Sequence, residues 1–137
     1  MAKTIEEFLE ASALRKHTVN DLKIEPIDLY EMSMLDRVGV IEEHGRIHKI
    51  LRDYEIAKED ALAEGTEFNE EDPSEQLAIL MAKTVLRSMF GFDKEYSEEQ
   101  CRMLCRKYSD AVLTELFNRV LNFRDLDESS INSAKKS

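Results

Sequence analysis

The sequence has 137 residues, 42% of them hydrophobic, and a formal net charge of −10 from 19 basic and 29 acidic residues. This length suits one domain with its own core, while the excess of acid disfavours binding to phosphate backbones or anionic membrane surfaces. With 4 glycines and 2 prolines, the composition argues against a turn-rich β fold and favours helices.

The N-terminus and the two cysteines both indicate a cytoplasmic protein. Residues 1–7 lack the apolar run of a signal peptide, and no apolar stretch approaches the ~20 residues that span a bilayer. Cys101 and Cys105 are too few for a disulfide framework. We therefore expect a cytoplasmic location, with both cysteines acting as small core residues.

The first 31 residues predict a short helix followed by an extended segment. Thr4 and Glu7 have the spacing of a capping box, in which each side chain satisfies a backbone N–H at the start of a helix. After this helix the hydrophobic pattern alternates only in part, and Pro26 interrupts it, so we expect at most a minor β element near residues 18–29. The apolar residues that share one face of the short helix are Ile5, Phe8, Leu9 and Ala13.

A long helix is predicted over residues 34–64. Ser33, with Asp36 three residues later, is a helix start signal, and Gly65 is a stop signal. An unbroken helix of this length would span ~46 Å, whereas a compact domain of this size has a diameter of about 37 Å. The helix therefore either breaks at one of its two internal glycines or projects and contacts another molecule. We expect one long helix.

Residues 72–75 give a strong start signal for the next helix, which we predict over residues 74–90. Asp72 is the predicted N-cap, Pro73 the first helical residue and Glu75 the third. Apolar residues follow at helical spacing on a broad face, which indicates a well-buried helix.

Two further helices complete the predicted fold. The helix over residues 74–90 ends at Gly91, and Ser97 and Ser109 each open another helix. We therefore predict an all-α fold, with a single domain of about five helices over residues 1–126. A flexible polar tail over residues 127–137 follows.

No residue pattern predicts a metal site, a cofactor or an enzyme. His44 and His48 are four apart, as zinc ligands can be, but no glutamate follows His44 and no third ligand is nearby. The segment from Asp93 resembles the start of a calcium loop, yet Glu98 and Leu104 replace the glycine and the glutamate that such loops need. A metal-dependent enzyme that uses the two histidines is the least favoured of three hypotheses.

The order of features over residues 73–126 resembles the tail assembly chaperones of long-tailed, lambda-like bacteriophages. In that family an apolar helix runs into a polar connector, an aromatic residue and a Ser/Thr-x-Glu/Asp start follow, and a serine opens a leucine-spaced terminal helix. Here the corresponding residues are Leu77, Ile79 and Leu80, then the connector 92–96 with Tyr96, then Ser97, Glu98 and Glu99, then residues 109–121.

The resemblance implies a binding function. Such a chaperone binds the long, helical, aggregation-prone tape measure protein, recruits tail tube subunits and is not retained in the virion. It acts in the cytoplasm of the infected bacterium, without nucleic acid or membrane, and a homo-oligomer is compatible with this role. The residues predicted to contact the client or a second copy are Leu113, Leu116, Phe117, Val120 and Leu121, and the alternative for all five is the protein core.

The acidic composition is also compatible with a different function. A small acidic adaptor or inhibitor, phage-encoded or not, would use the charge of −10 to occupy a basic surface on a host protein.

Overall fold

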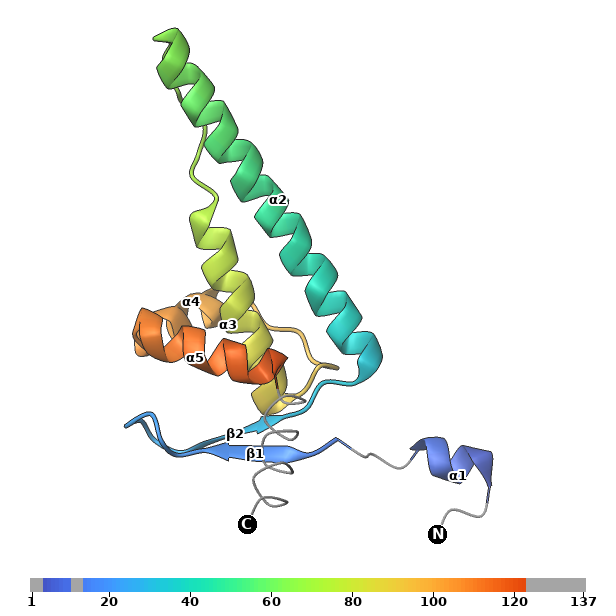
Figure 1. Ribbon diagram of the computed structural model, residues 1–137. Helices are drawn as coiled ribbons and strands as arrows, with labels where there is room; N and C mark the ends of the chain where they lie inside the picture. Colours follow the sequence, from blue (N-terminus) through green and yellow to red (C-terminus); the bar gives the residue numbers. More distant parts are fainter. Residues whose placement is uncertain (1–3, 11–13, 123–137) are drawn as a thin grey trace, which may run out of the picture.

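The computed structural model describes residues 4–10 and 14–122, so Ala13 and the predicted tail over 127–137 lie outside the described residues. Within them the chain forms five helices and one two-stranded sheet (Figure 1). The predicted all-α class, with one long helix and a minor β element, is confirmed. The elements in chain order are α1 (Ile5–Glu10), β1 (Lys16–Val19), β2 (Ile27–Tyr30), α2 (Met34–Glu64), α3 (Ser74–Phe90), α4 (Glu98–Lys107) and α5 (Asp110–Leu121).

The strands β1 and β2 form an antiparallel hairpin that lies across one end of α3 (Figure 1). Its register pairs Lys16 with Tyr30 and Val19 with Ile27. Because alternate residues of a strand point to opposite faces, Val19 and Leu29 are directed into the core and are buried. The partly alternating pattern in the sequence therefore corresponds to a hairpin.

Helix α2 is continuous and extends past the other helices (Figure 1). Ser33 Oγ accepts a hydrogen bond from the N–H of Asp36 (3.1 Å), and Gly65 ends the helix in the left-handed conformation at φ 69°. The buried residues of α2 are Val40 and His44, both in its first half. The expected single long helix is confirmed; it does not break at Gly39 or Gly45, and its second half carries no buried side chain.

The start of α3 differs in detail from the prediction. Pro73, not Asp72, occupies the N-cap position, and Ser74 is the first helical residue. The Oδ1 atom of Asp72 nevertheless accepts hydrogen bonds from the N–H (2.9 Å) and the Oγ (2.6 Å) of Ser74. Pro73 has no side-chain oxygen with which to cap, so the carboxylate one residue earlier performs this role.

Helix α3 packs against the hairpin, α2, α4 and α5, and it buries two polar side chains. Ser88 Oγ donates to the carbonyl oxygen of Tyr30 (2.8 Å), which ties α3 to β2. Thr84 Oγ1 donates to the carbonyl oxygen of Leu80 (2.9 Å). Both hydroxyls are satisfied, as burial in a core requires.

Helices α4 and α5 begin as predicted and close the core. Ser97 and Gln100 form a reciprocal capping box, and Ser109 Oγ accepts a hydrogen bond from the N–H of Val112 (3.2 Å). The core thus joins the hairpin to α3, α4 and α5. Its buried cluster comprises Val19, Leu29, Ala82, Val85, Cys101, Leu104, Leu113, Leu116, Phe117 and Val120.

Candidate functional site

The five residues predicted for partner contacts all lie on α5. Leu113, Leu116, Phe117 and Val120 are buried, and Leu121 is half-buried against the same cluster. Four of them therefore belong to the core, the alternative that the sequence left open. Contact of these residues with a partner stays a prediction, and it would require α5 to leave the core. Partner binding by the folded protein needs other surfaces.

His44 and His48 have different environments. His44 is buried: its ring centroid lies 4.7 Å from that of Phe117, and its Nε2 lies 3.4 Å from Thr84 Oγ1. Since that hydroxyl donates to the carbonyl oxygen of Leu80, it accepts from His44. Burial lowers the pKa of His44, and the neighbouring His48 lowers it further. His48 is exposed, and within residues 4–10 and 14–122 no group of three or more His, Cys, Asp or Glu is placed to hold a metal.

The first candidate binding surface lies on α2. Met34, Val38 and Ile41 follow one another at steps of four and three residues, so they share one face of the helix, and all three are exposed. Val40 and His44 mark the buried side of the same helix. We call the three exposed residues the α2 outer stripe.

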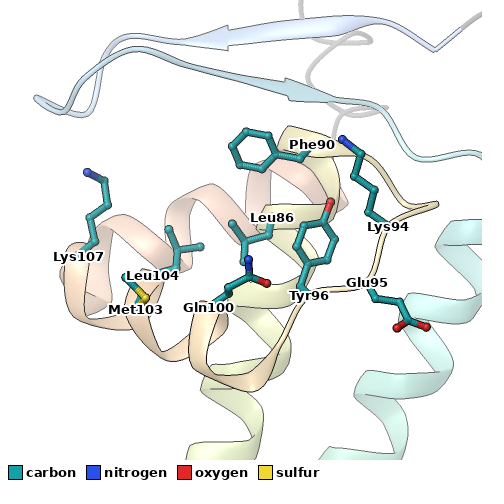
Figure 2. Close-up of a pocket in the computed structure, with 9 residues that line it drawn as sticks. All are labelled: Leu86, Phe90, Lys94, Glu95, Tyr96, Gln100, Met103, Leu104 and Lys107. Atoms are coloured by element: carbon teal, nitrogen blue, oxygen red, sulfur yellow. The ribbon is translucent and has the colours of Figure 1, made fainter.

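The second candidate surface is a groove of ≈ 580 Å³ between the end of α3, the connector 91–97 and α4. Figure 2 shows its side chains converging from these three segments. Phe90 and Met103 are 57% and 59% exposed, which is high for large apolar side chains. We call this surface the α3–α4 groove, and its apolar lining is Leu86, Phe90, Tyr96, Met103 and Leu104.

The connector that forms one wall of the α3–α4 groove is fixed by two residues. Gly91 follows α3 at φ 127°, a backbone conformation that glycine alone adopts readily. Tyr96 Oη donates to the carbonyl oxygen of Gly91 (2.7 Å), which closes the turn. Burial raises the pKa of Tyr96, and the nearby Asp93 raises it further, so the phenol remains a donor at neutral pH. The aromatic ring is thereby held against the groove.

Two lysines flank the α3–α4 groove. Lys94 and Lys107 stand at opposite ends of the apolar lining in Figure 2. The remaining polar lining is Gln100 and Glu95, and Glu95 points away from the apolar side chains. In a chain with a net charge of −10, an apolar groove with a cation at each end suits an acidic amphipathic segment.

The α3–α4 groove is not evident from the sequence, although one signal for it is present there. Cys101, Leu104 and Cys105 define the apolar face of α4, and Met103 lies on the opposite, polar face. A large apolar residue on a polar face is predicted to be exposed. Phe90 gave no such signal, because it continues the apolar run of α3.

Comparison with known proteins gave no match: no family model, no curated protein and no solved structure is similar to this chain. Among the described helices, none is both long and apolar enough to cross a membrane.

Proposed function

We propose that the protein is a bacteriophage tail assembly chaperone that binds the tape measure protein and recruits tail tube subunits to it. The observation that carries this proposal is the α2 outer stripe, because it presents three exposed apolar side chains on one face of the first half of a 31-residue helix. A long helical client has apolar stripes of the same period, and packing helix on helix covers both surfaces.

Two properties of the chain support this mode of binding. Met34 is an unbranched, adaptable side chain that can pack against varied client surfaces. The charge of −10 keeps a complex with an apolar client in solution. The proposed function needs no bond-making step and no cofactor, since binding alone shields the client from aggregation.

The test is co-expression of the chain with the tape measure protein of the same phage, followed by a pull-down and a binding measurement. The double variant Val38→Asp/Ile41→Asp places two charges in the α2 outer stripe and should weaken client binding by about 100-fold, because each buried aliphatic side chain contributes at least ~1.5 kcal/mol. Leu62→Asp is the matched control, since Leu62 is equally apolar and lies exposed at the far end of α2. Equal binding by the double variant and the control would contradict the proposal.

An acidic adaptor that occupies a basic host surface is the second candidate, and the net charge favours it. Salt distinguishes the two functions. Binding through exposed charge pairs weakens steeply as NaCl rises to about 0.5 M, because the Debye length falls to a few ångströms. Binding through the α2 outer stripe persists at that salt concentration and responds to Val38→Asp/Ile41→Asp.

A further inference from the structure

Helix α1 displays an apolar face that nothing in the described structure covers. Ile5, Phe8 and Leu9 are 74%, 68% and 71% exposed and share one side of the helix. The helix has six residues, and the Oγ1 of Thr4 accepts a hydrogen bond from the N–H of Glu7 (3.1 Å) at its start. A helix this short is marginal in water unless its apolar face packs on another surface. Helix α1 therefore requires a receiving surface.

The α3–α4 groove has the matching chemistry. The opposite face of α1 carries Glu6, Glu7 and Glu10, so the helix is amphipathic and acidic. The groove presents an apolar floor between Lys94 and Lys107. An acidic helix with three large apolar side chains would cover the exposed floor, and the long side chains of the two lysines at its ends could extend outward toward the glutamates on the other face of the helix.

We propose that α1 of one copy of this chain docks in the α3–α4 groove of a second copy. Its apolar face covers Phe90 and Met103, and its glutamates lie toward Lys94 and Lys107. Reciprocal docking of the two helices closes a symmetric dimer, because each copy supplies one helix and one groove. This proposal does not depend on the α2 outer stripe or on the proposed function.

The position of α1 favours a second copy over its own groove. Arg15 forms a bidentate ion pair with Glu31 (3.0 and 2.8 Å), which fixes the chain at the start of β1. Figure 1 shows α1 beyond that point, clear of α3 and α4. At most ~14 Å of chain can separate Glu10 from Leu14, so α1 stays near the start of β1. A second copy can bring its groove to α1 without this limit on distance.

Sedimentation equilibrium of the full chain, at concentrations from about 10 to 200 µM, tests the proposal. The wild type should reach about 32 kDa, twice the chain mass of 15.9 kDa. Phe8→Asp and Met103→Asp should each sediment near the mass of one chain, with unchanged circular dichroism because both side chains are exposed. Leu62→Asp makes the same chemical change at an exposed site outside both surfaces and should remain dimeric.

Mixing the two variants provides a second measurement, because chains that had lost their solubility or their fold would not form a dimer on mixing. The Phe8→Asp chain keeps an intact groove and the Met103→Asp chain keeps an intact α1, so an equimolar mixture should form a heterodimer through one remaining docking.

Three results would overturn the proposal. One is a wild type that stays monomeric over the whole concentration range. Another is a dimer that persists in both Phe8→Asp and Met103→Asp, which would assign the contact to a different surface. The third is a monomer whose groove amides are protected from hydrogen exchange and lose protection in Phe8→Asp, which would place α1 in its own groove. Loss of client binding without loss of the dimer would bear on the proposed function alone.

Discussion

Replacing Phe117 by alanine separates a core role for α5 from a contact role. Phe117 is buried in the core cluster, and its ring lies 4.7 Å from the ring of His44. Removing a buried phenylalanine costs 3–5 kcal/mol by order of magnitude, of which about 0.5–1.5 kcal/mol comes from the ring contact. Domains of this kind have a total stability of roughly 5–15 kcal/mol. We therefore expect Phe117→Ala to fold but to be strongly destabilised.

The assay is urea unfolding followed by circular dichroism. With a slope of about 2 kcal/mol per molar urea, the midpoint should fall by about 2 M. Leu121→Ala is the matched control, because Leu121 is half-buried at the end of the same helix and should lose about 1 kcal/mol. The reasoning is refuted if both variants shift the midpoint equally while only Phe117→Ala loses the client, since Phe117 would then be a contact residue.

Three further predictions address the connector, the buried histidine and the link to the hairpin. Gly91→Ala should lower the free energy of unfolding by about 1–3 kcal/mol in thermal melts, because an alanine is strained at φ 127°. Gly45→Ala is the matched control: its new Cβ meets no atom within 4 Å, so it should stabilise α2 by up to ~1 kcal/mol. The fold lowers the pKa of His44 below 6.5, so the unfolded chain binds a proton more readily than the folded chain does. The free energy of unfolding should therefore fall as the pH drops from about 7.5 to 5.5, by at most ~1.4 kcal/mol per pH unit. His44→Gln should abolish that slope, and an unchanged slope would assign it to other groups. Ser88→Ala should cost about 1–2 kcal/mol in urea unfolding, because the Tyr30 carbonyl loses a buried donor, and no loss would mean that water replaces the hydroxyl.

Helix boundaries were predictable because their determinants are local. Ser33, Ser97 and Ser109 each cap the helix that follows, and Gly65 ends α2 with a positive φ, as the residue types indicate. The predicted bounds of α3 are those of the structure, but its N-cap residue is Pro73 and not Asp72, because the sequence signal does not say whether the capping oxygen comes from the N-cap residue or from the residue before it.

The binding surfaces were less predictable, because they depend on how helices cross. The apolar stripe of α5 has the same period whether it faces the core or a partner, so the residues around Phe117 were compatible with both until their burial was known. The α3–α4 groove arises from the angle between two helices and from a connector that Gly91 and Tyr96 shape. Such geometry is not encoded in any short stretch of sequence.

The projection of α2 has a consequence for how the chain can vary. Beyond His44 the helix contributes no fully buried side chain, so whole turns near its tip can be removed or added, with matching changes in the loop 66–73, while the packed interior stays intact. The length of α2 beyond the core and the stability of the core are therefore separate properties of this molecule. The length of α2 can thus change between variants of this fold, whereas the core that carries the helix stays the same.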